Sequence, residues 1–290
     1  MKLHKQKRLL AFSLYFTLLG LFAAQQMSFA GPNQNDMKTD FAQLEANYKA
    51  SKNNLKKASK SNFNWDWLTP LDRLQQAYEN AGRYSDAEPL ARENLRVVVT
   101  AFGDKEGNAA STMDDLADIL VKLGKPDQLT EAEGLYKKSL DIAKKESHVY
   151  GEPAPNYGCS NVSKQLIGLG TIAMKQGKVK EAEKYFREYY NLAVKEEADR
   201  PRHIFMPVAT IELAKCLVAQ GQNDEAIKLY DAIVDMNVNA HCYNAKAEAL
   251  NQYAELLNRL GKKEKVASLQ KQARELQSQQ ANLNKGGLDY

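Results

Sequence analysis

The stretch that decides the fold is Gly177-Lys178-Val179-Lys180-Glu181-Ala182-Glu183-Lys184-Tyr185-Phe186. A Gly can end a helix in the left-handed conformation, because it has no Cβ and avoids the steric penalty that other residues meet there. The small Ala182 then allows the next helix to approach the first closely, and Phe186 follows four residues later. We therefore interpret the stretch as a helix-turn-helix joint.

The joint recurs along the chain, and its marker is a Gly that an Ala follows in an acidic and aromatic context. The other marker residues are Gly82 with Ala87, Gly124 with Ala132, Gly221 with Ala226, and Gly261 with Val266 in place of Ala. Successive marker Gly residues are 42, 53, 44 and 40 residues apart. An amphipathic segment precedes and follows each one, which predicts five helix pairs. Large aromatic side chains four residues after the marker Ala are predicted to fill the space between pairs: Tyr136, Phe186 and Tyr230.

Residues 1–30 have the order of a secretory signal peptide, in which basic residues precede an apolar run and a small-x-small cleavage signal. The apolar run, Leu9 to Ala24, is 16 residues long, shorter than the roughly 20 that a spanning helix needs. This length favours cleavage between Ala30 and Gly31 and predicts an exported, periplasmic or secreted protein. The alternative is an uncleaved signal anchor. N-terminal sequencing distinguishes the two, because the exported protein would begin at Gly31 or at Met1.

The formal charge of +4 belongs to this first segment. Residues 1–30 hold four basic and no acidic residues, so the remaining chain has 36 basic and 36 acidic residues and no net charge. Nucleic-acid binding depends on clustered Lys and Arg that neutralise phosphates. We therefore expect a protein or peptide as the partner, no nucleic acid, and a membrane only if the signal is uncleaved. The oligomeric state is left open.

The remaining 260 residues divide into three parts. Residues 31–68 form an N-terminal segment, in which apolar residues at helical spacing predict a capping helix from about Asp40 to Lys56. Residues 69–277 contain the five helix pairs. Residues 278–290 lose the apolar periodicity and are predicted to be a disordered tail.

The joint from Gly177 to Phe186, with Leu169-Gly170 before it, resembles a tetratricopeptide repeat. The run Ala87-Glu88-Pro89-Leu90 and the long units are similar to the kinesin light chain subtype of that family. The resemblance covers roughly residues 69 to 275. It implies an all-α fold, an α-α superhelix in the form of a right-handed solenoid, whose first helices line a concave groove. The subtype's Asn-Asn-Leu-Ala run and its His-Pro linker are missing, and Gln75 and Asn94 stand where small residues are usual.

The resemblance also implies which residues face the groove. In this family they lie on the first helix of each pair, ten and six residues before the marker Gly, with further positions two and three residues before it. The predicted groove is acidic in its first two repeats and gains basic residues later, which would orient a bound peptide. The candidate protein-binding residues are Asp72, Gln76, Asp114, Asp118, Lys122, Thr171, Lys175, Lys215, Asn251, Glu255, Asn258 and Arg259. An ordinary solvated helix face is the alternative interpretation of the same residues.

Some family members bind chaperone tails through a carboxylate clamp, which needs Lys and Asn at fixed groove positions of the first repeats. Asp72, Gln76, Asp114 and Asp118 occupy those positions here. The sequence therefore argues against a carboxylate clamp.

The three cysteines are predicted to be thiols, with no disulfide. Cys216 lies 5 residues before its marker Gly, whereas Cys159 and Cys242 lie 18 and 19 residues before theirs. At a rise of 1.5 Å per residue, the position of Cys216 along its helix is offset by roughly 20 Å from the positions of Cys159 and Cys242 along theirs. Cys159 and Cys242 are two repeats apart, again roughly 20 Å for helices packed 8 to 10 Å from one another. A disulfide needs Cα atoms within about 7 Å.

The sequence contains no recognisable catalytic or cofactor motif. It has no Gly-x-Ser-x-Gly, phosphate-binding loop or Cys-x-x-Cys, and His241-Cys242 is the only adjacent pair of soft metal ligands. We therefore expect no cofactor, no metal and no enzymatic activity. The favoured function is an exported protein-protein interaction scaffold or adaptor. The alternatives are a membrane-tethered structural component of a cell-envelope assembly, and an enzyme in which Asp114 and Asp118 would be essential for turnover.

Overall fold

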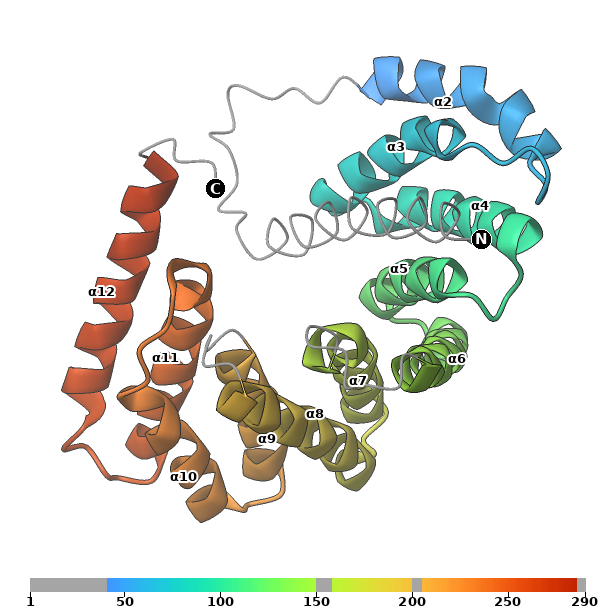
Figure 1. Ribbon diagram of the computed structural model, residues 1–290. Coiled ribbons are helices and arrows are strands. Elements are labelled where there is room, and N and C mark those ends of the chain that lie inside the picture. The colour runs from blue at the N-terminus through green and yellow to red at the C-terminus, as the bar shows by residue number, and fades with distance from the viewer. Residues whose placement is uncertain (1–40, 150–157, 200–204, 286–290) are drawn as a thin grey trace. The chain divides into compact units, whose positions relative to one another are not determined.

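The computed structural model describes residues 41–149, 158–199 and 205–285, and within them the fold is all-α (Figure 1). The described residues form eleven α-helices and two short 3-10 helices, and no strand. The predicted signal peptide and its cleavage site, Ala30 and Gly31, lie outside the described residues. The expected capping helix is present as α2, Phe41–Lys57.

The ten helices after α2 form the five predicted pairs, each joined at a marker Gly. The pairs are α3 (Thr69–Asn80) with α4 (Tyr84–Phe102), α5 (Gly107–Leu123) with α6 (Pro126–Val149), α7 (Gly158–Lys175) with α8 (Val179–Asp199), α9 (Met206–Ala219) with α10 (Asn223–Val234), and α11 (Tyr243–Arg259) with α12 (Val266–Lys285). The short helix η1 (Trp65–Trp67) precedes α3, and η2 (Ala240–Cys242) precedes α11. The prediction of an all-α solenoid of five helix pairs is confirmed.

The marker Gly residues adopt the conformation that the sequence predicts. Their φ angles are all positive, from 69° at Gly82 to 76° at Gly221. In four of the five joints the next residue donates its backbone N–H to a carbonyl five residues back, as Lys178 does to Ala173 at 2.8 Å. This bond is the Schellman motif, which satisfies a carbonyl that the helix end would otherwise leave unbonded. At Gly124 the Gly N–H instead bonds the carbonyl of Leu120 at 2.9 Å.

Close contact between the helices is provided by small residues that face aromatic rings. The four marker Ala residues are fully buried, and Tyr136, Phe186 and Tyr230 are 1 %, 1 % and 3 % exposed. A Cβ added at Gly168 would lie 2.4 Å from the Tyr136 ring, and one added at Gly170 would lie 2.4 Å from the Phe186 ring. The predicted filling of the space between pairs is confirmed for Tyr136 of α6, which packs against Gly168 of the next pair. The ring of Phe186 instead lies against Gly170 within its own pair of α7 and α8.

The helices group into two compact units. Residues 39–201 with 208–232 contain α2 to α8 and most of α9 and α10, and the other unit contains α11 and α12. In the first unit the first helices α5 and α7 contact each other directly, while α6 and α8 lie on the other side of the stack (Figure 1).

The prediction of a disordered tail from residue 278 is wrong up to Lys285. Helix α12 continues to Lys285. Leu269 and Ala273 are buried, and partly buried residues follow at Leu276, Gln280 and Leu283. These residues are three or four positions apart, so they continue the buried stripe of the helix. One of them, Gln280, is polar, and the apolar period was therefore not visible in the sequence.

Candidate functional site

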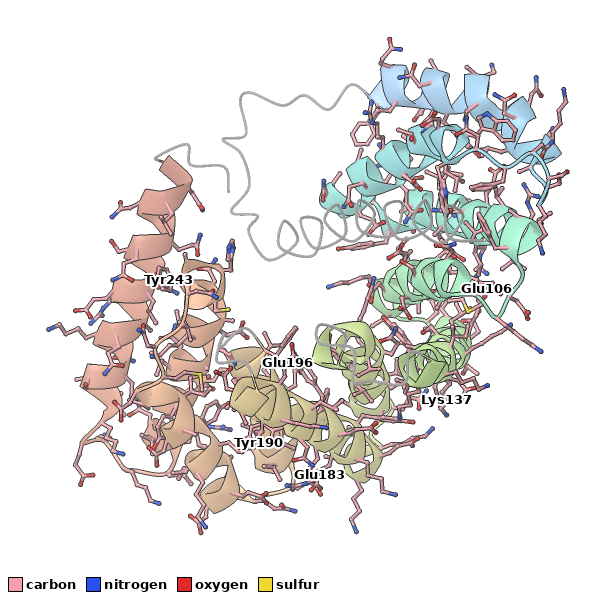
Figure 2. All side chains as sticks on the ribbon, in the orientation of Figure 1. Glu106, Lys137, Glu183, Tyr190, Glu196 and Tyr243 are labelled. Carbon is pink, nitrogen blue, oxygen red and sulfur yellow. The ribbon has the colours of Figure 1, made fainter. Side chains whose placement is uncertain are left out.

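The structure places the predicted groove residues in both units, so we describe them by unit. In the first unit, four are exposed, namely Asp72, Lys122, Lys175 and Lys215, and three are partly exposed, namely Gln76, Asp118 and Thr171. In the second unit all four are exposed on α11: Asn251, Glu255, Asn258 and Arg259. Eleven of the twelve predicted residues are therefore exposed or partly exposed. Figure 2 shows the side chains of the described residues on the ribbon.

The twelfth residue, Asp114, was predicted to be a groove residue and is instead buried, with 5 % of its surface exposed. Its carboxyl group accepts hydrogen bonds from the Ser139 hydroxyl of α6 and from Nε2 of Gln165 of α7, the latter at 2.6 Å. These two donors compensate part of the cost of burying the carboxyl. The prediction failed because it assigned every residue at that position to the surface, whereas α6 and α7 both cover α5 at this level.

Asp118 belongs to a cluster that the lysine Lys164 organises. The Lys164 Nζ lies 2.8 Å from a carboxyl oxygen of Asp115 and 2.8 Å from one of Asp118. Asp118 also accepts a hydrogen bond from the buried Tyr136 hydroxyl. Burial alone would lower the pKa of Lys164, but the two carboxylates outweigh it and raise that pKa. Lys164 thus remains an ammonium ion that joins α7 to α5.

Two carboxyl groups of α3 complete the cluster, and each is bonded to a buried amide. Asp72 accepts from Nδ2 of Asn94 at 2.8 Å, and Glu79 accepts from Nε2 of Gln75 at 2.9 Å. Desolvation and the neighbouring Asp115 raise the pKa of Asp72. Desolvation first, and then Asp115 and Asp118, raise the pKa of Glu79 against the opposing effects of Gln75 and Lys164. Carboxyls of α3 and α5 are therefore close enough to repel one another.

We call this cluster the first-helix face, because its residues come from α3, α5 and α7, the first helices of three successive pairs. It consists of Asp72, Glu79, Asp114, Asp115, Asp118 and Lys164, of which Asp114 lies beneath the surface. With all groups ionised, five carboxylates and one ammonium give it a formal charge of −4. The predicted acidic character of the first two repeats is thus present, but with a lysine from the third repeat inside it.

Sequence reasoning did not identify Lys164 and Glu79 as members of this cluster. Lys164 lies thirteen residues before Gly177, near the start of α7, and Glu79 lies three residues before Gly82. Lys164 falls outside the positions from which the groove was predicted, whereas Glu79 occupies one of them, three residues before its marker Gly, but was not selected. A signal was available for Gln75 and Asn94, because polar residues stood where the resemblance implies small ones. The structure shows that they serve as hydrogen-bond donors to the acidic residues.

A second set of charged residues, also missed, lies on the second helices. Arg92 of α4 binds Glu131 of α6 through two parallel hydrogen bonds of 2.6 and 2.7 Å, and Arg187 of α8 binds Glu225 of α10 at 2.8 Å. Each Arg also binds a Glu four residues earlier on its own helix, at 2.9 and 2.7 Å. We call these contacts the second-helix ladder; its residues are Glu88, Arg92, Glu131, Glu183, Arg187 and Glu225.

The ladder has a sequence signal. In both cases the Arg lies ten residues after its marker Gly, and the partner Glu in the next repeat immediately precedes the marker Ala. The ion pairs of Arg92 with Glu131 and of Arg187 with Glu225 therefore lie at equivalent positions of their repeats. The contacts join successive repeats without involving the first helices.

In the second unit the polar residue that stands out is Lys246 of α11, which is 8 % exposed. Its ammonium group donates to the backbone carbonyl of Met236, and burial lowers its pKa. The interaction fixes the segment before η2 against α11. The four predicted groove residues lie further along α11, so Lys246 has a structural role separate from them.

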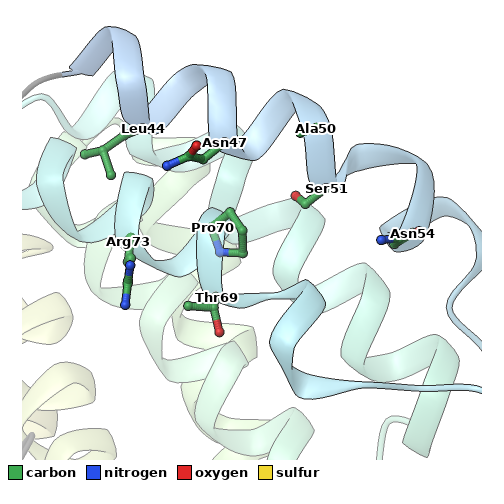
Figure 3. A pocket seen from close by; sticks show the side chains of 8 residues that line it. All are labelled: Leu44, Asn47, Ala50, Ser51, Asn54, Thr69, Pro70 and Arg73. Carbon is green, nitrogen blue, oxygen red and sulfur yellow. The ribbon is translucent and has the colours of Figure 1, made fainter.

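A pocket in the first unit lies between α2 and α3, away from the first-helix face (Figure 3). Its lining residues are Leu44, Asn47, Ala50, Ser51, Asn54, Thr69, Pro70 and Arg73. None of them was predicted to face the groove. The pocket therefore adds no support for the predicted ligand residues.

The described residues offer little for catalysis or metal binding. No group of three or more His, Cys, Asp or Glu side chains is placed to hold a metal ion in the part of the chain that the structure describes. Cys216 and Cys242 are buried thiols, and burial, followed by the nearby Glu183, raises the pKa of Cys216. The side chain of Cys159 lies outside the described residues, so the prediction of three thiols stays a prediction.

No helix among the described residues is both long and apolar enough to cross a membrane. The segment that the sequence proposes as a signal or anchor is not among those residues.

Comparisons with known proteins agree with the repeat architecture. The tetratricopeptide repeat family model matches residues 173–249. The crystal structure of kinesin light chain nearly identical TPR-like repeats from Podosopora anserina superposes with a TM-score of 0.54 at 18 % identity, covering 73 % of this chain and 95 % of that one. BtubC (BKLC) from P. vanneervenii superposes with a TM-score of 0.59 at 14 % identity, covering 85 % and 94 %. Among curated proteins, none matches the sequence.

At these identities the two crystal structures are similar to this chain in fold alone. The family match covers the end of α7, the pairs' joints at Gly177 and Gly221, and the first part of α11. Residues 173–249 thus match the tetratricopeptide repeat family, and the fold of the chain is similar to that of the kinesin light chain TPR-like repeats and of BtubC.

Proposed function

We propose that this protein is an exported, non-catalytic scaffold that binds a cationic segment of another protein on its first-helix face. The observation that carries the proposal is the charge of that face, which has five carboxyl groups from α3 and α5 and a single ammonium group, whose ion pairs are with Asp115 and Asp118. Tetratricopeptide repeats are interaction modules, and the fold supports a scaffold in general terms. Export rests on the order of basic, apolar and small residues in residues 1–30.

Lys164 indicates what kind of group the face accommodates. Its amine is held by two carboxylates at 2.8 Å each, so the spacing of Asp115 and Asp118 suits one primary ammonium group. Asp72 and Glu79 lie on the neighbouring helix and have neutral amide partners rather than cationic ones. A lysine or arginine side chain of a partner would supply the missing positive charge.

The experiment that tests this function uses a fluorescent peptide of about ten lysines as the probe and a glutamate peptide of equal length as its control. The double variant Asp72→Asn, Glu79→Gln keeps the shape of both side chains and removes their charge. We expect the lysine peptide to bind wild type and to bind the variant about three- to thirty-fold more weakly, since two partly exposed ion pairs contribute roughly 0.6–2 kcal/mol. The glutamate peptide should not bind.

A matched control is the double variant Asp127→Asn, Asp224→Asn. These two carboxylates are exposed on second helices, outside both the first-helix face and the second-helix ladder. The control should bind the lysine peptide as wild type does. If it loses as much affinity as the first variant, the binding is a general effect of charge and the proposed site is wrong. Absence of binding to wild type would contradict the proposed partner class.

A further inference from the structure

Three buried amide side chains at the first-helix face share one unusual bonding pattern. Asn94, Gln75 and Gln165 are 8 %, 7 % and 4 % exposed. Each donates its side-chain N–H to a carboxyl group, at 2.8, 2.9 and 2.6 Å, to Asp72, Glu79 and Asp114 respectively. In each amide the carbonyl oxygen is buried and has no hydrogen-bond partner. Leaving such an acceptor unsatisfied costs about 1–3 kcal/mol.

Protonation of the neighbouring carboxyl group would give each of these oxygens a hydrogen-bond donor. An ionised carboxylate can only accept hydrogen bonds, so it cannot serve the amide oxygen beside it. A protonated carboxyl group has one O–H to donate and still accepts the amide N–H. One proton taken from solvent therefore completes an acid–amide pair with two hydrogen bonds, and at the buried Asp114 it also removes a poorly solvated negative charge.

The surroundings of the three carboxyls favour that protonation. The charged and titratable groups that face them are Asp115 and Asp118 of α5, Lys164 of α7 and Tyr136 of α6. For Asp114, burial raises the pKa to about 7, although Ser139 and Lys164 act in the opposite direction. The pKa values of Asp72 and Glu79 are raised by desolvation and by the charges of α5.

We infer that the three acid–amide pairs form a proton switch, which takes up protons as the pH falls through neutrality and releases a cationic partner from the first-helix face. The inference rests on the proposed function for its partner. Three protons reduce the formal charge of the face from −4 to −1. Asp115 and Asp118 then remain as carboxylates, and Lys164 already binds both of them. The protonated face has no carboxylate left over for a partner.

The size of the effect follows from the titration of a single group. For a carboxyl with a pKa near 7, the ionised fraction falls about tenfold between pH 8 and pH 6. Because removal of the Asp72 and Glu79 charges should weaken binding about three- to thirty-fold, we expect the lysine peptide to bind wild type more weakly at pH 6 than at pH 8 by up to about that factor. The ionised face should also take up fewer protons when the peptide is bound, because a nearby cation favours the charged form.

The first measurement is a carbon-13 NMR titration of the Asp and Glu side-chain carboxyls without any peptide. Signals are assigned from the single variants Asp72→Asn, Glu79→Gln and Asp114→Asn. We expect Asp72 and Asp114 to have their midpoints near 7, and the pKa of Glu79 to lie above its ordinary value because of desolvation. Midpoints below pH 5 for the three groups would overturn the switch, whatever the peptide does.

The second measurement is the pH dependence of lysine-peptide binding by wild type and by the triple variant Asp72→Asn, Glu79→Gln, Asp114→Asn. The triple variant imitates the protonated face and should bind weakly and equally at pH 6 and pH 8. Asp127→Asn, Asp224→Asn should keep the wild-type pH dependence. If wild type binds equally well at both pH values, the switch is wrong and the proposed function stands. If the carboxyls titrate near neutrality and no peptide binds at any pH, the proposed function is wrong. The proposed release of a cationic partner is then wrong as well.

Discussion

The first-helix face and the second-helix ladder use the same kinds of charged residue in opposite ways. In the ladder each exposed carboxylate meets an Arg, and the Arg92 and Glu131 side chains are both 41 % exposed. In the first-helix face three of the five carboxyls meet neutral amides, and one of them, Asp114, is buried. Every carboxylate of the ladder pairs with an Arg, although its four carboxylates and two guanidinium groups leave a formal charge of −2. In the face, three carboxyls have an amide as their hydrogen-bond donor and no ion pair among the described residues.

Gln128 makes the contrast specific. It is a fourth buried amide with an unpartnered carbonyl oxygen, and its Nε2 donates to Glu88 at 3.2 Å. Glu88, however, also binds Arg92 at 2.9 Å. The same acid–amide contact therefore has a cation beside it at Glu88. In the pairs of Asp72 with Asn94 and of Glu79 with Gln75, the amide is the hydrogen-bond donor to the carboxyl, and no ion pair within the described part of the chain accompanies it. The difference teaches that carboxyls on the first helices are placed to gain protons or a partner, and those on the second helices to join repeats.

The largest effect that would sharpen this comparison is expected for Asp114→Asn. With a folded-state pKa of about 7 against an ordinary value near 3.8, Asp114 is protonated in the folded protein and ionised in the unfolded chain between about pH 4 and pH 7. The folded state binds more protons in that window, so the free energy of unfolding of wild type falls as the pH rises. An Asn cannot ionise. We therefore expect the free energy of unfolding of Asp114→Asn, relative to that of wild type, to rise by about 2–3 kcal/mol between pH 5 and pH 8.

The measurement is urea unfolding of wild type and Asp114→Asn at pH 5, 6, 7 and 8. Gln128→Leu serves as the control, because it removes a buried amide of the ladder and leaves the first-helix face intact. Its difference from wild type should show no trend of this sign with pH. If the free energies of unfolding of wild type and Asp114→Asn change with pH in parallel, Asp114 has the same charge in the folded and the unfolded state.

A smaller effect is expected for Gly168→Ala, which tests the packing beneath the first-helix face. A Cβ at Gly168 would lie 2.4 Å from the ring of Tyr136, whose hydroxyl binds Asp118. The ring is 1 % exposed and cannot move without disturbing its neighbours. Overpacking of this kind costs about 1–3 kcal/mol. The loss should appear in the midpoint of urea unfolding, and the tyrosine absorbance should show a changed environment.

Gly134→Ala is the matched control for that substitution. Gly134 lies within α6, it is exposed, and a Cβ there would meet nothing within 4 Å. Since Ala is the better helix former, this variant should be more stable than wild type by about 0.5–1 kcal/mol. Equal behaviour of the two Gly variants would mean that the contact of α7 with Tyr136 is looser than the structure describes.

The sequence was sufficient to predict the helix pairs, because each depends on a local pattern. Gly177 ends one helix, and Ala182 allows the next helix to pack closely against it. Both effects depend on residues less than ten positions apart. The buried position of Asp114 could not be predicted this way. It depends on Ser139 and Gln165, which reach it from two other helices at separations of 25 and 51 residues.

The partners of the acidic residues show the same limit. A count of charges finds the acidic start of the face, but Lys164 enters it from the next repeat. Such a residue can be found only when the stacking of the first helices is known. The ladder, by contrast, could have been predicted from the register of Arg92 and Arg187, because both lie at the same distance from a marker Gly.

The smallest expected effect concerns the ladder itself, in the variants Arg92→Gln and Arg187→Gln. Each Arg forms one contact to the next repeat and one within its helix, and the side chains are 41 % and 39 % exposed. Water and salt weaken exposed ion pairs, so each substitution should lower the free energy of unfolding by only about 0.2–1 kcal/mol. The loss should shrink in 0.5 M salt, where screening has already removed most of the attraction. Wild type and both variants are compared by urea unfolding at low and high salt. A loss that persists at high salt would mean that the Arg stems stabilise the repeats by packing rather than by charge, as buried side chains do, although they are about 40 % exposed.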